Sequence, residues 1–548
     1  MTITSASAVP ADARGAATFD GFLRVRDGRL VDGADRPVLL RGIGLGNWLL
    51  PEGYMWRFDG GPQSPREIEA LVVDLVGERR AGEFWAGFRD AFITEDDIAL
   101  IAEQGFDHVR LPINSRIVLD DDGHVRPDGF ALIDRTIDWC RAHGLWVLLD
   151  LHGAPGGQTG TNIDDSPRGR PELFESAEYR AQTVHLWREL ATRYAHEPVV
   201  AGYDLLNEPL PNEWQDVYAD RLVDLYRELT RVIREVDDQH LIVYEGTHWA
   251  TNWSIFTEVW DPNSVLQFHK YWSTPDYPSI ERFVETGRRL GLPAYMGEGG
   301  ENNPDWLATA FQLYEDHNVS WNFWTWKKLD TRTSPLSVVP PAGWADVVAY
   351  AAGGGARPDA ADAWRVLGDL VAAVRAEACE RRVAVVHGLF RRPPVRLPAI
   401  GYSFRGEGVS YGGGHPNDGD DEGVLRGDDP VAIRYEGDGE PGFDLVAGRP
   451  GAVERDLVVT LGAGQWVAYE VHPRAGQVLG EVVVEGRGSA PVVRVDGVVA
   501  GVSTWIEGEG GWRAEVVAAP ALTERREGAR VVIEGGAGGT TVRSVTVG

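Results

Sequence analysis

Cysteine is almost absent from this chain, which has only Cys140 and Cys379 among its 548 residues. Two cysteines cannot build the disulfide framework of a small secreted domain, and their spacing matches no zinc site. Cys140 ends the apolar, periodic run 132–140, which predicts a buried free thiol rather than a bridge.

Long hydrophobic runs are also missing. No apolar stretch reaches the roughly 18 residues that a membrane-spanning helix needs. Residues 1–18 lack the positively charged and then apolar segments of a secretory signal peptide. We therefore expect a disordered tail over 1–18 and a cytoplasmic protein.

Positive charge is scarce, because 53 Lys and Arg residues face 83 Asp and Glu, a formal net charge of −30. Only Lys270, Lys327 and Lys328 are lysines. Such a surface repels phosphates, so nucleic acid and anionic membranes are poor partners, whereas neutral substrates are not excluded. Lys327 and Lys328 fit either solvated loop charges or substrate contacts, and the oligomeric state stays open.

The composition of the chain changes near residue 385. Before it, strand-like runs alternate with helix-like runs; after it come β-branched alternation, glycine and proline. We predict an α/β catalytic domain over 19–385, which begins with a hairpin of Phe22–Arg26 and Pro37–Leu40, and a β-sandwich over 386–548.

Eight strand-then-helix units fit the first domain. The expected strands are Leu40–Gly44, His108–Ile113, Trp146–Leu151, Ala201–Leu206, His240–Tyr244, Val265–Phe268, Ala294–Met296 and Ser320–Trp324. The expected helices are Glu95–Gln104, Asp128–His143, Glu178–Tyr194, Glu213–Val236, Ser279–Leu290, Asp305–His317 and Asp359–Ala378. This alternation favours a (β/α)₈ TIM barrel, with an open doubly wound sheet as the alternative.

Short strands separated by turns predict the C-terminal β-sandwich. They are Ala432–Tyr435, Leu457–Leu461, Trp466–Val471, Glu481–Val484, Val492–Val495, Gly501–Ile506, Arg513–Val517, Arg530–Ile533 and Val542–Val547.

Polar and aromatic residues gather where the expected barrel strands end, which is where barrel enzymes place their catalytic groups. They are Arg110, His152, Asn207, Glu208, Glu245, His269, Tyr271, Glu298, Trp324 and Lys327. Glu208 and Glu298 follow strands four and seven, so they can face each other across the barrel mouth. Two carboxyl groups about 5–5.5 Å apart are what retaining glycoside hydrolysis requires. Arg110 and Tyr271 are candidates to keep Glu298 ionised.

Six motifs occur in register on these strands: Val-Arg-Leu-Pro at Arg110, Leu-His-Gly-Ala-Pro-Gly at His152, Leu-Asn-Glu-Pro at Glu208, His-Lys-Tyr at His269, Gly-Glu at Glu298 and Phe-Trp at Trp324. Together they resemble glycoside hydrolase family 5 over about residues 38–378. The resemblance implies a (β/α)₈ barrel, net retention at β-glycosidic bonds, and no metal or other cofactor.

The resemblance also implies a role for each matching residue. Glu208 is the acid/base and Glu298 the nucleophile, Asn207 holds the sugar 2-hydroxyl, and Arg110 and Tyr271 support the nucleophile. His152 and His269 line the cleft, and Trp324 forms the platform under the sugar. The stretch Leu149–Gln158 looks most like the exo-β-1,3-glucanase branch, although Gly299 stands where that family often has an aromatic residue, and Glu301 lies close by as a competing carboxylate.

We interpret the chain as a retaining β-glycosidase that acts exo on β-glucosides or short β-glucans. Two long connections, Leu49–Phe92 with its aromatic residues and Gly153–Ser176, are expected to wall off one end of the cleft. An endo-acting β-glucanase or mannanase, a transglycosylase and a non-catalytic sugar-binding protein are the alternatives. The C-terminal stretch 464–476 resembles β-sandwich carbohydrate-binding modules, in which Trp505 and Trp512 could stack on sugar and Trp466 fits a core residue equally well.

Overall fold

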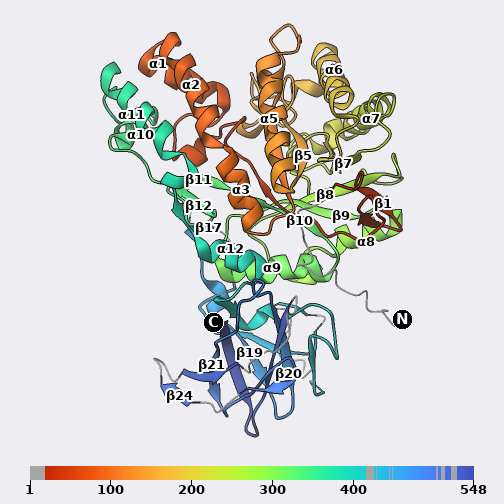
Figure 1. The fold of residues 1–548 in the computed structure, drawn as a ribbon, viewed down its shortest axis with the longest axis vertical. Helices are drawn as coiled ribbons and strands as arrows, with labels where there is room; N and C mark the ends of the chain where they lie inside the picture. The colour runs from red at the N-terminus through yellow and green to blue at the C-terminus, as the bar shows by residue number, and fades with distance from the viewer. Residues whose placement is uncertain are drawn as a thin grey trace.

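The computed structural model describes residues 19–414, 425–427, 429–443, 445–446, 449–500, 504–507, 512–519 and 528–548. Figure 1 shows two parts, a barrel ringed by helices and a smaller C-terminal part drawn in blue. The expected tail over 1–18 lies outside the described residues.

Eight parallel strands close into a barrel in the order β10-β3-β4-β5-β6-β7-β8-β9. They are β3 (Arg41–Gly44), β4 (His108–Asn114), β5 (Trp146–Gly153), β6 (Val200–Asp204), β7 (Leu241–Glu245), β8 (Ser264–Lys270), β9 (Ala294–Gly300) and β10 (Ser320–Trp324). All eight expected strands are present, and the closed order confirms the (β/α)₈ barrel over the open sheet.

Amphipathic helices cover the barrel. They are α3 (Glu95–Glu103), α5 (Pro127–His143), α6 (Ala177–Tyr194), α7 (Gln215–Arg234), α8 (Glu281–Leu290), α9 (Pro304–Asp316) and α11 (Ala360–Ala373). In α7, for example, Leu222, Leu225, Leu229 and Ile233 are buried at helical spacing and face the strands. The structure assigns no helix to the described segment between β7 and β8, where the sequence left room for only a turn or two.

The connection after β3 differs from the expectation. It contains two helices, α1 (Pro65–Val76), which begins with a Ser64 capping box, and α2 (Glu78–Phe92). Its aromatic residues pack on one another: the Trp56 ring lies 5.0 Å from Phe88 and 5.8 Å from Trp85, and all three are buried. These residues therefore form a core under the helices instead of the expected wall of the cleft.

The initial hairpin also differs. It pairs β1 (Arg24–Arg26) with β2 (Arg29–Val31), and the expected second strand at Pro37–Leu40 makes only an isolated bridge, from Pro37 to Val31. The tight turn at Asp27 and Gly28, both with positive φ, brings the chain back two residues after β1 and so sets the earlier pairing.

The C-terminal part consists mainly of two antiparallel sheets. One joins β16 (Ala432–Tyr435), β19 (Leu457–Leu461), β27 (Thr540–Val547), β21 (Glu481–Gly488), β25 (Arg513–Ala518), β24 (Thr504–Glu507) and β14 (Val395–Pro398). The other joins β15 (Tyr411–Gly412), β20 (Trp466–Val471), β26 (Ala529–Glu534), β22 (Val492–Val495) and β23 (Val498–Val499). Every described strand after residue 394 pairs within the C-terminal part, so none of them joins the barrel. Two antiparallel sheets with alternating buried residues fit the expected sandwich.

The two parts meet at the helices α9 and α12 (Val383–Phe390), which lie between them in Figure 1. The helix α12 falls at the composition change near 385, where no helix was expected. Asp305 on α9 pairs with Arg396 on β14, and Asp316 accepts a hydrogen bond from the Phe404 backbone at 2.7 Å.

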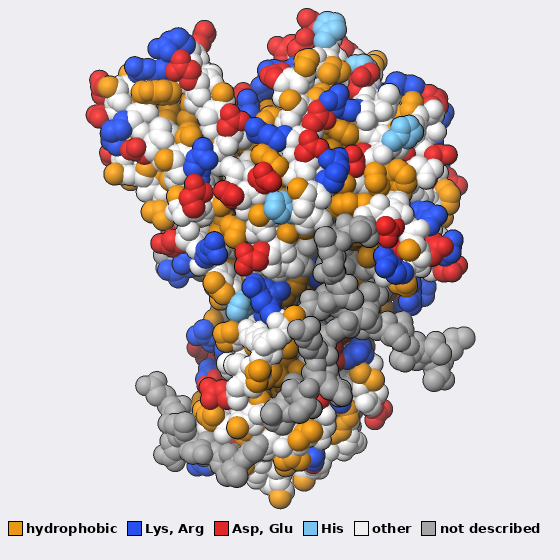
Figure 2. All heavy atoms as spheres, in the orientation of Figure 1, with side chains coloured by type: hydrophobic (Ala, Val, Ile, Leu, Met, Phe, Trp, Pro, Cys, Tyr) orange, Lys and Arg blue, Asp and Glu red, His pale blue; other side chains and the backbone are white. Residues whose placement is uncertain are grey.

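All three lysines are buried, because Lys270, Lys327 and Lys328 are 6 %, 0 % and 7 % exposed. The positive side chains that Figure 2 shows interspersed with acidic ones on the surface are therefore arginines. None of the described helices is both long enough and apolar enough to cross a membrane.

Candidate active site

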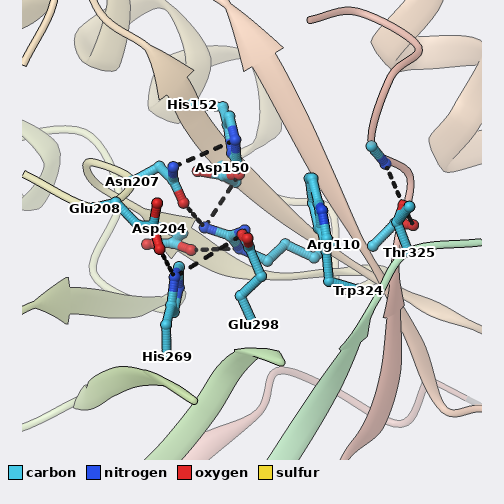
Figure 3. A network of polar contacts seen from close by, with 12 residues as sticks. Arg110, Asp150, His152, Asp204, Asn207, Glu208, His269, Glu298, Trp324 and Thr325 are labelled. Atoms are coloured by element: carbon cyan, nitrogen blue, oxygen red, sulfur yellow. Dashed lines mark hydrogen bonds and ion pairs between the residues drawn. The ribbon is translucent and has the colours of Figure 1, made fainter. Parts of the chain in front are cut away.

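The structure brings the predicted site residues together at the carboxyl ends of the barrel strands. Figure 3 shows most of them converging on one point, with Arg110 in the middle. Arg110 lies inside β4. The others lie near or just after the ends of their strands: His152 on β5, Asn207 and Glu208 after β6, His269 and Tyr271 at β8, Glu298 on β9 and Trp324 on β10. Parallel strands end at the same rim, which is why positions so far apart in sequence meet here.

Glu208 and Glu298 face each other across this point. One carboxylate oxygen of each, together with a ring nitrogen of His269, lies within 4.8 Å of the others. An approach this close between carboxylate oxygens suits the retaining arrangement, in which the two carboxyl groups stand about 5–5.5 Å apart. The same three groups could touch a metal ion, but the Arg110 guanidinium already donates to Glu298 Oε2, and its positive charge opposes a cation there.

Two donors hold Glu298. The Tyr271 hydroxyl donates to Oε1 at 2.6 Å, and Arg110 Nη1 donates to Oε2 at 2.8 Å. Burial raises the pKa of Glu298, and Glu208 raises it further, whereas His269 and Arg110 oppose that rise. Both donors bond to the ionised form, and they fix the direction of the carboxylate.

Arg110 is fully buried and organises the floor of the site. Its guanidinium lies 2.8 Å from Asp204, 3.1 Å from Asp150 and 3.1 Å from Glu245, and Nη2 donates to Asn207 Oδ1 at 2.9 Å. Burial alone would lower the pKa of Arg110, but the surrounding carboxylates raise it well above its ordinary value. The charge is therefore permanent and directional.

Glu208 has an unusual backbone conformation, with φ of 45°. Its N–H donates to Glu245 Oε2 at 2.7 Å, and its carboxylate lies 2.8 Å from His269 Nδ1. Burial alone would lower the pKa of His269, but Glu245, Glu298 and Glu208 raise it well above its ordinary value. Glu245, for which the sequence suggested a supporting role, thus positions both Glu208 and Arg110.

His152, Asn207 and Trp324 line one side of the site. His152 Nδ1 lies 2.7 Å from Asp150, its Nε2 lies 3.3 Å from Asn207 Nδ2, and its ring is parallel to that of Trp324, 5.4 Å between centroids. Trp321, three residues earlier on β10, points to the other face and is buried against Phe311 at 4.8 Å, as strand alternation predicted.

Sequence reasoning missed two residues that belong to this site, Glu52 and Tyr54. The Tyr54 hydroxyl accepts a hydrogen bond from Trp324 Nε1 at 2.8 Å. Glu52 is 4 % exposed; burial raises its pKa to about 8, and the negative charges of Glu298, Glu208 and Glu301 contribute. The sequence contained one indication of Glu52, because this residue is an isolated carboxylate shortly after the end of β3.

The two lysines after β10 differ in role. Lys327 is fully buried, lies 2.6 Å from Asp97 and donates to the Val374 carbonyl at 2.8 Å, so it is a structural residue beneath the surface. Lys328 forms an ion pair with Glu301, and its Nζ lies 5.2 Å from the centre of the Tyr54 ring. Glu301, the competing carboxylate of the sequence analysis, is therefore already charge-paired.

In the C-terminal sheets, the guanidinium groups of Arg487 and Arg543 lie over the Trp512 ring at 4.9 and 5.0 Å, and Arg530 lies over Trp466 at 5.1 Å. These cation–π contacts occupy ring surface that a stacked sugar would need. The Trp505 side chain lies outside the described residues, so its expected role stays a prediction.

Comparison with known proteins identifies the family. A family model described as "Cellulase (glycosyl hydrolase family 5)" matches residues 76–330. A β-xylosidase of Phanerodontia chrysosporium is 30 % identical over 56 % of this chain and 71 % of its own length. A probable glucan 1,3-β-glucosidase A of Emericella nidulans is 32 % identical over 46 % of this chain, which spans 62 % of that relative, and endoglucanase C of Acetivibrio thermocellus is 29 % identical over 44 % of this chain and 86 % of its own length.

Solved structures also match. An endogalactoceramidase structure is 17 % identical with a TM-score of 0.46, and the match covers 94 % of this chain and all of that one. Thermotoga maritima Cel5A in complex with cellobiose is 21 % identical with a TM-score of 0.40, covering 57 % of this chain and 97 % of that one.

Proposed function

This chain belongs to glycosyl hydrolase family 5, and we propose that it is a retaining β-glycosidase that cleaves β-glucosidic bonds with Glu298 as nucleophile and Glu208 as acid/base. The observation that carries the proposal is the pair of carboxylates whose oxygens lie within 4.8 Å of each other. Their surroundings support this division of roles. Glu298 receives the Tyr271 and Arg110 donors, which favour a carboxylate aimed at the anomeric carbon. Glu208 is then the carboxyl group that gives a proton to the leaving group and later takes one from water.

The reaction proceeds in two steps. Glu298 attacks the anomeric carbon while Glu208 gives its proton to the departing oxygen, which forms a glycosyl ester on Glu298. Glu208, now a carboxylate, takes a proton from water, and that water displaces Glu298 from the anomeric carbon. Two inversions restore the β configuration. Asn207 lies beside both His152 and Arg110, which suits it to hold the sugar 2-hydroxyl above the Trp324 platform.

The exo preference is supported by groups at the far edge of the platform. Tyr54 bonds the Trp324 indole, and the Lys328–Glu301 ion pair stands behind Tyr54. These side chains come from the connections after the first, seventh and eighth barrel strands. Side chains in these positions favour a closed end with room for one terminal sugar, whereas an endo-acting enzyme needs an open groove. The related proteins are named for both exo and endo activities, so the endo-acting β-glucanase remains the second candidate.

A panel of aryl β-glycosides (glucoside, xyloside, galactoside, mannoside) tests the activity and the glycone. Proton NMR of the reaction should show the β-anomer of the sugar released first. Release of the α-anomer first would refute retention, and binding without turnover would favour the non-catalytic sugar-binding alternative. Glu298→Gln is the control for background hydrolysis. With laminarihexaose, glucose as the sole early product indicates exo action, and mixed oligosaccharides indicate endo action.

A further inference from the structure

A cavity of about 70 Å³ lies at the junction between the barrel and the C-terminal part (Figure 1). Arg41, at the start of β3, and Gly105, shortly before β4, line it from the barrel. His472 and Arg474, which follow β20, line it from the C-terminal part. The cavity therefore lies at the amino ends of the barrel strands, whereas the active site occupies their carboxyl ends.

Positive charge dominates the lining of this cavity. Four arginines, Arg41, Arg391, Arg392 and Arg474, line it together with one acidic residue, Glu315. Four positive charges against one negative charge leave a surplus of three, although the chain as a whole carries a formal net charge of −30. Glu315 is bound by Arg41, whose Nε and Nη2 donate to it at 2.7 and 2.9 Å. Such a local surplus attracts an anion.

Gln104 holds two of these arginines close together. Arg392 Nη2 donates to the Gln104 carbonyl at 2.9 Å, and Arg474 Nη2 donates to the Gln104 side-chain oxygen at 2.7 Å. An amide neutralises neither charge, and the exposed Glu103 lies 3.9 Å from Arg474. Two like charges held on one neutral residue repel each other, and an anion placed between them relieves that repulsion.

Arg391 is the lining residue with the greatest need for a partner. It is 1 % exposed, and its Nη2 donates to the Gly401 carbonyl at 3.0 Å. Its Nε and Nη1 are buried as well and have no hydrogen-bond partner among the described residues. A buried charged group with unused donors is costly unless an acceptor meets them.

No carboxylate of the described residues forms an ion pair with Arg391. Burial lowers the pKa of Arg391 to about 10, and Asp316 and Glu315 oppose that change only in part. Both are engaged elsewhere, since Asp316 accepts a hydrogen bond from the Phe404 backbone and Glu315 is bound by Arg41. Burial acts on Arg41 in the same direction, but its pKa is raised because Glu315 pairs with it. Arg391 thus differs from Arg41 in lacking an anionic partner.

We propose that this cavity binds one small tetrahedral oxyanion, inorganic phosphate or sulfate, and that the anion joins the barrel to the C-terminal part. Guanidinium groups bind such oxyanions through paired N–H donors. The arginines line the cavity from both parts of the chain, so oxygens that point in several directions suit them better than the two coplanar oxygens of a carboxylate. The volume is several times the roughly 10–15 Å³ that a single water needs.

Isothermal titration calorimetry of the full chain with sodium phosphate and sodium sulfate, in a chloride buffer at pH 7, tests the site. Wild type should bind one anion per chain, and sodium acetate should bind far more weakly. Arg391→Met removes the unused donors and should weaken binding by at least about 10-fold, the effect of one hydrogen bond to a charged group. Arg474→Gln, from the C-terminal part, should also weaken it, and this variant decides the test if Arg391→Met does not fold.

Arg494→Gln is the matched control. Arg494 lies on β22, where it pairs with Glu534 at 3.1 Å, and its side chain is 35 % exposed against 44 % for Arg474. It removes the same charge away from the cavity and should leave the affinity unchanged. An anion that binds only the folded protein raises Tm, so phosphate should raise Tm of wild type and Arg494→Gln, but not of Arg391→Met, above Tm in sodium chloride of equal ionic strength.

Three results would overturn the proposal. The first is no binding of either anion to wild type, and the second is acetate binding as tight as that of phosphate, which indicates a general counter-ion effect. The third is an unchanged affinity in either cavity variant that folds, because both parts of the chain must then not contribute. Anion binding requires no turnover, so these results are independent of whether the chain hydrolyses a glycoside.

Discussion

Replacement of Glu52 by glutamine should stabilise the protein, and by an amount that depends on pH. Glu52 is almost fully buried, and its neighbours Glu298, Glu208 and Glu301 add negative charge, while His152 acts in the opposite direction. The charged form is therefore costly in the folded state.

The sign and size of this change in stability follow from the pKa of Glu52, which burial raises from 4.5 to about 8. Between these pH values the folded protein holds a proton that the unfolded chain has released, so stability falls as pH rises and levels off above about pH 8. At ~1.36 kcal/mol per pH unit, the cost is about 5 kcal/mol above pH 8 and about 3 kcal/mol at pH 7. Glutamine has the same shape and no charge, so Glu52→Gln avoids this cost.

Urea denaturation followed by tryptophan fluorescence at pH 4.5, 6, 7 and 8 measures the effect. The difference in unfolding free energy between Glu52→Gln and wild type should be close to zero at pH 4.5 and grow with pH. Glu213→Gln, at an exposed carboxyl, is the control and should show almost no difference at any pH. A difference that stays constant across this range, or a variant less stable than wild type at pH 7, would refute the reasoning.

Three further substitutions test the site. Glu298→Gln should bind substrate and lose most turnover, because the covalent route is gone; more than a few per cent of wild-type kcat would point to another carboxylate, with Glu301 first. Glu208→Ala should retain glycosylation on a dinitrophenyl glycoside and lose it on a disaccharide, and added azide should yield a β-glycosyl azide; equal losses on both substrates would reject Glu208 as the acid. Arg110→Met should reduce the unfolding free energy by about 3–5 kcal/mol in urea titrations, because four carboxylates lose their buried partner, and a near-neutral change would show that these carboxyls are protonated instead.

The barrel and the centre of the site could be predicted because they depend on local pattern. Alternation of strands and helices sets the rim, and a polar residue at a strand end, such as Glu208 or Glu298, has its position fixed by the strand. Glu52 and Tyr54 could not be placed in the same way, since they lie in a long connection whose path depends on packing. Lys327 was ambiguous because its partner Asp97 is 230 residues earlier, and such a pairing appears only when the chain folds.

The connection after β3 shows a second limit of prediction from the sequence. Its aromatic residues suggested a cleft wall, but they pack under α1 and α2. The Ser64–Glu67 capping box, which marks the start of α1, was legible in the sequence as Ser-Pro-Arg-Glu. These helices were not predicted, because the aromatic residues of the connection were interpreted as a cleft wall and not as the buried stripe of a helix.

The burial of every lysine has a chemical consequence for an enzyme that releases reducing sugars. The open-chain aldehyde of such a sugar condenses with unprotonated amines to form a Schiff base, the first step of glycation. Here all three lysine residues are buried, and the ε-amino groups of two of them are paired with Asp97 and Glu301. The lysine side chains are therefore protected from glycation by the sugar that the enzyme releases. For the same reason, amine-reactive dyes or resins should not couple to a lysine of the folded protein.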